Sequence, residues 1–123
     1  MAVSGSVLIV DDDPAFQSLA GRLLADCGLA VAGLAGTAGA AMTEAARLRP
    51  DAVLVDVGLP DGDGIALACE LAALPWRPRI LLTSSNADAA GPSEIRRSRA
   101  EGFIPKSQLP NAALDQILGA RSP

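Results

Sequence analysis

Short apolar runs alternate along the chain with longer segments in which apolar residues recur at helical spacing. The run Val7–Val10 is apolar on both faces, which is typical of a buried parallel strand. The segment 15–27 spaces its large apolar residues for one helical face, which predicts an amphipathic helix. Asp13 and Pro14 suit the start of that helix, as its cap and its first residue. The same alternation predicts strands over 30–34, 52–55, 80–82 and 102–104.

Two further helices are expected between these strands. Thr37 opens one of them and Pro50 ends it, and the other covers 65–74. Repeated alternation of strand and helix predicts an α/β fold, with a parallel sheet covered by helices on both faces, because each crossover is right-handed. The length of 123 residues fits one such domain.

The last two helices are less regular. Gly91-Pro92 interrupts the interval after the fourth strand, so we expect only a short helix over 93–100, weakly anchored by Ile95. A final helix is expected over 109–118, with Pro110 in its first turn.

Composition excludes several classes of function. The chain has no histidine, which removes most zinc sites and every catalytic pair that depends on histidine. Its two phenylalanines and one tryptophan are too few for a platform that stacks single-stranded nucleic acid. No apolar run approaches the ~18–20 residues of a membrane span, and the short uncharged N-terminus is unlike a signal peptide. We therefore expect a cytoplasmic protein with no membrane partner.

Polar residues with useful chemistry directly follow the predicted strands. In a parallel sheet the carboxyl ends of the strands share one edge, and ligands bind in the crevice outside that edge. These side chains are therefore expected to meet in one crevice. In strand order they are Asp11, Asp12, Asp56, Thr83 and Lys106.

A crevice lined by these residues suits a metal ion and a phosphoryl group. Carboxylates 4 Å apart repel one another by about 4 kcal/mol at an effective dielectric constant near 20, so a proton or a cation must offset their charge. Oxygen ligands without histidine or cysteine favour Mg²⁺. Lys106, the only lysine in the chain, adds a positive charge. Asp56 is then the carboxylate that attacks phosphorus and becomes an aspartyl phosphate.

The acidic residues are concentrated at this crevice. The formal net charge is −4, from 14 acidic and 10 basic residues. We attribute this acidity to a metal site rather than to general solubility. The acids at or beside the crevice are Asp11, Asp12, Asp13, Asp56, Asp61 and Asp63.

Four motifs together resemble the receiver domain of bacterial two-component response regulators. They are VLIVDDDP (7–14), DAVLVDVGLPDGDG (51–64), ILLTSS (80–85) and GFIPKS (102–107), and the resemblance covers residues 6–118. It implies a flavodoxin-like, doubly wound (βα)5 fold with a five-stranded parallel sheet of order 2-1-3-4-5. It also implies a single receiver domain over 6–120, between a disordered N-terminal tail (1–5) and a C-terminal tail (121–123).

The resemblance implies a role for each residue of the metal site. Asp56 would be the phosphoacceptor and Asp12 a direct ligand of Mg²⁺. Asp11 would act on the metal through water, and Gly58 would complete the metal shell with its backbone carbonyl. The phosphoryl group would come from a sensor histidine kinase, a phosphotransfer protein or a small acyl phosphate.

The resemblance also implies a conformational switch rather than an enzyme. Thr83 would contact the phosphoryl group through its hydroxyl, and Lys106 would pair with it. Phe103 occupies the aromatic switch position and would turn inward when Thr83 moves. The alternative for Thr83 is a strand-end hydroxyl that satisfies a backbone group, and the alternative for Phe103 is a plain core residue.

Ser107 departs from the family pattern, in which a proline often follows the lysine. This variant occurs in receivers attached to helix-turn-helix domains, so the resemblance implies transcription regulation through a DNA-binding output domain. A homodimer formed on phosphorylation is a further expectation. The chain is then either a stand-alone receiver or the input half of a longer regulator.

Two other functions stay open at this point. A receiver-like interaction module would work without phosphorylation and would not respond to Mg²⁺. A magnesium-dependent phosphohydrolase of the haloacid-dehalogenase type would also use an aspartyl phosphate. That class needs a second aspartate two residues after the nucleophile, where this chain has Gly58.

Overall fold

Strands and helices alternate through residues 5–119, the part of the chain that the computed structural model describes. Each predicted strand is present, with its ends within two residues of the expected ones. The strands are β1 (Ser6–Val10), β2 (Ala30–Ala35), β3 (Ala52–Asp56), β4 (Arg79–Ser84) and β5 (Gly102–Pro105). The helices are α1 (Pro14–Asp26), α2 (Ala38–Leu48), α3 (Gly64–Ala72), α4 (Pro92–Ser98), the 3-10 helix η1 (Lys106–Asn111) and α5 (Leu114–Leu118).

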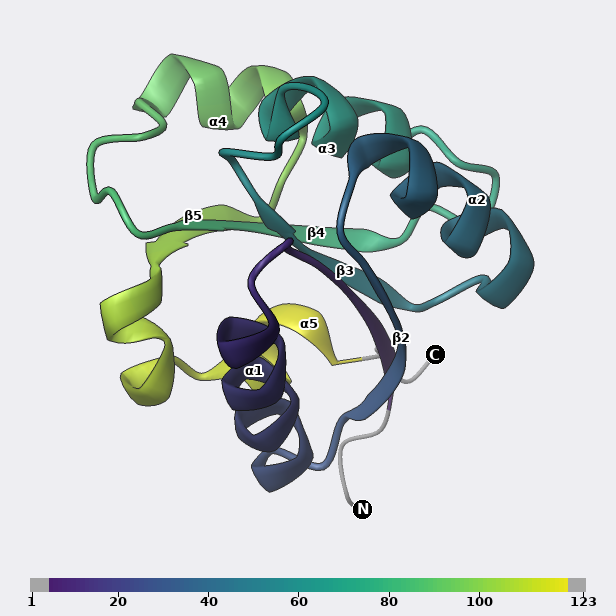
Figure 1. The fold of residues 1–123 in the computed structure, drawn as a ribbon, viewed down its shortest axis with the longest axis vertical. Coiled ribbons are helices and arrows are strands. Elements are labelled where there is room, and N and C mark those ends of the chain that lie inside the picture. Colours follow the sequence, from purple (N-terminus) through teal and green to yellow (C-terminus); the bar gives the residue numbers. More distant parts are fainter. Residues whose placement is uncertain (1–4, 120–123) are drawn as a thin grey trace.

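The strands form one parallel sheet in the order β2-β1-β3-β4-β5. Figure 1 shows α1 and α5 against one face of the sheet, and α2, α3 and α4 against the other. This arrangement confirms the flavodoxin-like (βα)5 fold. Because the strands are parallel, the carboxyl ends of β1, β3 and β4 meet at the same edge of the sheet.

The interior strand β1 contributes to two apolar cores. Val7 and Ile9 pack with α1 and α5, whereas Leu8 and Val10 pack with α2 and α3. All four side chains are fully buried. Burial on both faces is the reason that this strand has a continuous apolar run instead of an alternating pattern.

Side chains at the sheet edge fix where the helices begin. The Asp13 carboxylate accepts a hydrogen bond from the N–H of Ala15 (3.0 Å), and the Thr37 hydroxyl accepts one from Ala40 (3.0 Å). Asp63 caps α3 in the same way. These bonds satisfy N–H groups that have no partner within their own helix. The predicted helix starts at Asp13 and Thr37 are confirmed.

The fourth helix is short, as predicted. Its first turn is closed by Glu94, whose carboxylate accepts the N–H of Gly91 at 3.1 Å. Ile95 is the apolar side chain that packs against the core on this face, and the helix lies against α3.

The prediction of a continuous helix over 109–118 is wrong. Residues 106–111 form η1 with Pro110 inside it, and Ala112 is extended (φ −88°, ψ 147°). Proline has no N–H to donate, and 3-10 helices end after a few residues, so α5 begins only at Leu114. Figure 1 shows the two pieces as separate coils. The break lets both Leu109 and Leu114 reach the core.

The predicted tails lie outside the described residues, except for Gly5. The carbonyl of Gly5 accepts a hydrogen bond from the N–H of Ala30 at 2.9 Å, so this residue is already bonded to the start of β2. Within residues 5–119, none of the helices has the length and apolar character needed to span a membrane.

Candidate functional site

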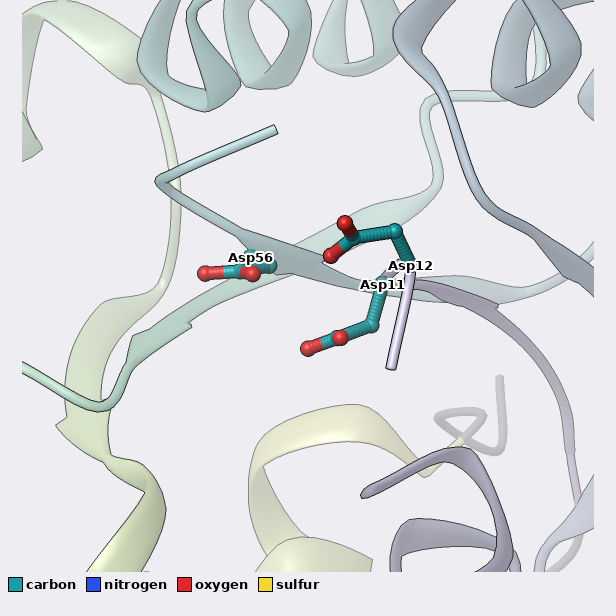
Figure 2. Close-up of side chains that lie close together, drawn as sticks. All are labelled: Asp11, Asp12 and Asp56. Carbon is teal, nitrogen blue, oxygen red and sulfur yellow. The ribbon is translucent and has the colours of Figure 1, made fainter. Parts of the chain in front are cut away.

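Three carboxylates meet at the carboxyl ends of β1 and β3. Val10 pairs with Val55 in the sheet, so the next residues, Asp11 and Asp56, emerge side by side. Asp12 follows one residue later, and Figure 2 shows its side chain diverging from that of Asp11. One oxygen from each of the three carboxylates lies within 4.8 Å of the others. The structure therefore brings together the three acids that the strand ends predict.

Asp11 is fully buried and fixed by its neighbours. Its Oδ1 accepts the N–H of Asp13 at 2.9 Å, and the side-chain amide of Gln17 donates to its backbone carbonyl at 2.6 Å. Its Oδ2 lies 2.7 Å from Nζ of Lys106 and forms an ion pair with it. The Asp11 carboxylate is therefore held by a backbone N–H at one oxygen and by a positive charge at the other.

Asp56 is the buried acid at the end of β3, with 8% of its surface exposed. Its Oδ1 accepts the N–H of Gly58 at 3.2 Å. Burial raises the pKa of Asp56 above its ordinary value, and the charges of Asp11 and Asp12 raise it further. The Gly58 hydrogen bond and the charge of Lys106 oppose this rise. The protein's own groups therefore do not fully offset the cost of a negative charge on Asp56.

These groups fit a hard divalent cation. All the side-chain donors are oxygens, which suits Mg²⁺ rather than zinc or copper. The close grouping of three carboxylates and the disfavoured charge of Asp56 both indicate a place for additional positive charge. Asp12 is exposed, so solvent can reach the cluster. An incomplete carboxylate shell suits Mg²⁺ because this ion usually keeps several waters.

Lys106 begins η1 directly after β5, and its ammonium reaches the acidic cluster. Nζ lies 2.7 Å from Oδ2 of Asp11 and 3.8 Å from Oδ2 of Asp56. The ring of Phe16 lies close by, with its centroid 4.2 Å from Nζ. The structure therefore places the predicted lysine against both buried acids, and it adds an aromatic contact.

The hydroxyl of Thr83 is bonded to the backbone of the neighbouring strand. Thr83 pairs with Asp56 in the sheet and is fully buried. Its Oγ1 donates to the carbonyl of Ile104 in β5 at 2.7 Å. In this conformation it satisfies a backbone group, as the alternative interpretation stated. Phe103, the residue before Ile104, is half-buried and packs on the core beneath α2, α3 and α4.

The loop after β3 is held in place by two further contacts. A Cβ at Gly64 would lie 2.3 Å from the carbonyl oxygen of Asp56, so only glycine fits at this position. The Asp61 carboxylate accepts the N–H groups of Ala38 (2.7 Å) and Gly39 (3.2 Å) at the start of α2. These hydrogen bonds lower the pKa of Asp61 below its ordinary value. The loop that follows Asp56 is therefore tied to both α3 and α2.

The acids near the crevice divide into two groups. One group is the cluster of Asp11, Asp12 and Asp56. The other group caps helices, where negative charge is favoured by the helix dipole. The expectation that all six acids serve a metal site was too broad. The capping acids are Asp13 at α1, Asp61 at α2 and Asp63 at α3.

Comparison with known proteins identifies the family. Residues 7–118 match the family model of the response regulator receiver domain. The chain belongs to this family. This receiver domain is 34% identical over 110 residues to protein-glutamate methylesterase/protein-glutamine glutaminase 2 of Anaeromyxobacter dehalogenans, covering 89% of this chain and 31% of that protein. It is 37% identical over 102 residues to the DNA-binding transcriptional activator DevR/DosR of Mycobacterium tuberculosis, covering 81% of this chain and 46% of that protein.

The solved structures support the same assignment. A crystal structure of a LuxR-family two-component response regulator from Aurantimonas sp. superposes on this receiver domain with a TM-score of 0.81 and 27% identity, covering 98% of this chain and 91% of that chain. By contrast, the chain spans less than half the length of the two curated relatives, 31% and 46%. What these relatives share with this chain is thus the receiver domain.

Two residues that support the site of this receiver domain had no distinct signal in the sequence. Phe16 fits the apolar stripe of α1, and Gln17 fits its polar face. Only the structure shows that Phe16 faces Lys106 and that Gln17 bonds to Asp11. Their position just after the acidic pair was the one clue available.

Proposed function

We propose that this receiver domain accepts a phosphoryl group on Asp56 in the presence of Mg²⁺ and acts as a conformational switch. The observation that carries the proposal is the buried Asp56 carboxylate, clustered with Asp11 and Asp12 and 3.8 Å from Lys106. A nucleophile, two further carboxylates and a cation thus share one crevice, which is the set of groups that phosphoryl transfer to a carboxylate requires.

In the proposed step, a carboxylate oxygen of Asp56 attacks the phosphorus of the donor. An O–P bond forms while the donor's own bond to phosphorus breaks, and the leaving group keeps that electron pair. The broken bond is N–P in a phosphohistidine and O–P in an acyl phosphate. Lys106 is near enough to neutralise an oxygen of the transferred group.

The residues proposed to hold the metal are Asp12, Asp56 and the backbone carbonyl of Gly58, with Asp11 acting through water. Asp11 suits the water-mediated place because its Oδ1 already accepts an N–H and its Oδ2 faces Lys106. When bound, Mg²⁺ supplies positive charge that offsets the carboxylates and the phosphoryl oxygens. Asp12 is exposed and can meet a hydrated ion at the rim.

The switch is proposed to follow from the new charge on Asp56, close to −2. That charge attracts the hydroxyl of Thr83, which must leave the carbonyl of Ile104. Phe103 lies next to Ile104 on β5 and is proposed to turn inward as Thr83 moves. Phosphorylation then shifts the balance between two conformers of the domain.

The proposed partners follow from the family. A sensor histidine kinase or a phosphotransfer protein donates the phosphoryl group in the cytoplasm, and phosphorylation promotes a homodimer. The relatives named as a DNA-binding activator and as a methylesterase support an output domain, in this protein or in another. Ser107 favours a DNA-binding output. The domain itself is proposed to extend over 6–120.

Phosphohydrolase activity is disfavoured by Gly58. This residue gives only its N–H to Asp56 and has no side chain to act as a general acid. We therefore propose a switch whose only chemistry is gain and loss of its own phosphoryl group.

Intact-protein mass spectrometry tests the proposal. After incubation with an acyl phosphate and Mg²⁺, we expect the mass of one phosphoryl group to be added, and we expect a chelator to prevent it. Asp56→Asn should remove the adduct. Asp88→Asn changes an exposed acid of the loop after β4 and should leave it unchanged. An adduct that survives in Asp56→Asn would contradict the proposal, and no adduct in the wild type would favour an unphosphorylated interaction module.

A further inference from the structure

The ammonium of Lys106 is held by an aromatic ring as well as by carboxylates. Nζ lies 4.2 Å from the centroid of the Phe16 ring and 2.7 Å from Oδ2 of Asp11. We infer that Phe16 is a positioning residue that keeps Lys106 at the phosphoryl site. This inference rests on the function proposed above, because it assigns to Phe16 a part in the same reaction.

The ring belongs to a buried, well-packed corner of the fold. Phe16 lies in the first turn of α1, is 6% exposed, and packs with Ala20 and Leu24 of the same helix. The start of that helix is fixed by the Asp13 cap. Asp11 precedes the cap by two residues, so the contacts that Asp11 and Phe16 make with Lys106 both come from the segment 11–16. The Lys106 side chain extends from η1 and contacts this segment.

The two contacts differ in their response to a bound metal. A cation bound in the carboxylate cluster partly neutralises the charge of Asp11, and this weakens the attraction between Asp11 and Lys106. The Phe16 ring carries no net charge and attracts the ammonium through its quadrupole, most strongly where water is excluded. The Lys106 side chain is only 17% exposed. The share of the ring in holding Lys106 is therefore larger when the metal is bound than when it is absent. The metal-bound state is also the one in which the phosphoryl group arrives.

A residue that only fills the core would behave differently. Its loss would lower stability without changing the surroundings of Lys106. Leu24 offers the matched control, because it lies on the same helix and in the same core, fully buried, and makes no contact with Lys106 among the described contacts. Phe16→Leu removes the ring face and keeps an apolar side chain, whereas Phe16→Tyr keeps the ring face.

Nuclear magnetic resonance of the lysine side chain provides the first readout. Lys106 is the only lysine in the chain, so a protein labelled with ¹³C-lysine gives one set of Cε–Hε signals. In the wild type we expect the ring to shift the Hε signals upfield of their position in the urea-unfolded chain, with and without Mg²⁺. Phe16→Leu should move them downfield, while Phe16→Tyr and Leu24→Ala should leave them near the wild-type position.

The rate of phosphorylation by an acyl phosphate at saturating Mg²⁺ provides the second readout. We expect Phe16→Leu to slow it about threefold to tenfold, and Phe16→Tyr and Leu24→Ala to stay near the wild-type rate. Wild-type Hε signals without the upfield shift would overturn the inference, and so would an unchanged rate in Phe16→Leu or an equal loss in Leu24→Ala. If the wild type forms no adduct, the proposed function itself fails and the inference falls with it.

Discussion

Thr83 donates its hydroxyl hydrogen to the carbonyl oxygen of Ile104, 2.7 Å away on the adjacent strand β5. Thr83 is also the register partner of the proposed phosphoacceptor Asp56 on β3. One side chain thus stands between the acceptor strand and the strand that carries Phe103. A hydroxyl has a single hydrogen to donate, so it serves either Ile104 or a phosphoryl group on Asp56.

Replacing Thr83 by valine should remove both roles of its hydroxyl, and each loss has its own readout. Valine keeps the shape and removes the hydroxyl, so the bond to Ile104 is lost and the free energy of unfolding should fall by about 1 kcal/mol. The phosphorylated variant should also leave the NMR signals of Phe103 close to their unphosphorylated positions. Urea unfolding and ¹H–¹³C spectra of the aromatic rings measure these effects.

Thr83→Ser is the control for that experiment. Serine keeps the hydroxyl and loses one methyl group, so the Phe103 signals should still respond to phosphorylation. A full response of Phe103 in Thr83→Val would show that the hydroxyl does not carry the signal.

Neutralising Asp56 should stabilise the unphosphorylated domain at neutral pH. Its pKa is raised in the native state by burial and by Asp11 and Asp12, so the folded protein binds the proton more tightly than the unfolded chain. Stability then falls as the pH rises from the ordinary aspartate pKa of about 3.9 through the raised native value. Asp56→Asn removes this penalty and can still accept the Gly58 N–H.

The pH dependence of urea unfolding measures the effect of Asp56→Asn. The variant should be more stable than the wild type at pH 7, and the difference should shrink as the pH falls toward the ordinary aspartate pKa. A gain of equal size at every pH would mean that the charge of Asp56 is not its cause. Asp88→Asn should show no comparable gain.

Gly64→Ala should disturb the acceptor directly. Its Cβ would meet the carbonyl oxygen of Asp56 at 2.3 Å, and backbone atoms cannot move aside as the end of a side chain can. We expect a loss of about 1–3 kcal/mol in the free energy of unfolding and slower phosphorylation of Asp56.

Gly21→Ala is the matched control for Gly64→Ala. A Cβ at Gly21, within α1, would lie an ordinary 3.7 Å from Val31, so this change should stabilise the helix by about 0.5–1 kcal/mol. If Gly64→Ala were as stable and as active as the wild type, the close approach to Asp56 would not constrain the site.

Removing the Asp61 carboxylate should loosen the loop after β3. Asp61→Ala leaves the N–H groups of Ala38 and Gly39 at the start of α2 without their partner. Because the native pKa of Asp61 is lowered, its contribution is present at neutral pH and is lost as the pH falls below the ordinary aspartate value. Amide hydrogen exchange of Ala38 and Gly39 should therefore be faster in the variant at pH 7. Exchange as slow as in the wild type would show that water replaces the carboxylate without loss.

The sequence predicts the sheet and the acidic cluster well because both depend on strand ends. An apolar run buried on both faces must end where polar residues begin, and parallel strands bring those ends together. This logic placed Asp11 and Asp56 side by side, as the register of Val10 with Val55 confirms. It needs no knowledge of side-chain conformation.

The features that escaped prediction depend on conformation or on distant contacts. Pro110 is compatible with the first turn of an α-helix and with a 3-10 helix, so its sequence context did not reveal η1. The direction of the Thr83 hydroxyl is a choice between rotamers. The contact between Phe16 and Lys106 joins α1 to η1 across most of the chain, and no local pattern encodes it.

The central claim, that Asp56 accepts the phosphoryl group, is tested most directly by locating that group on the chain. Borohydride reduces an acyl phosphate to an alcohol, so a phosphorylated aspartate becomes homoserine while free aspartates survive. After reaction with an acyl phosphate and Mg²⁺, peptide mapping by mass spectrometry should find homoserine at position 56 and at no other aspartate. Homoserine at Asp11 or Asp12, with Asp56 unchanged, would contradict the account.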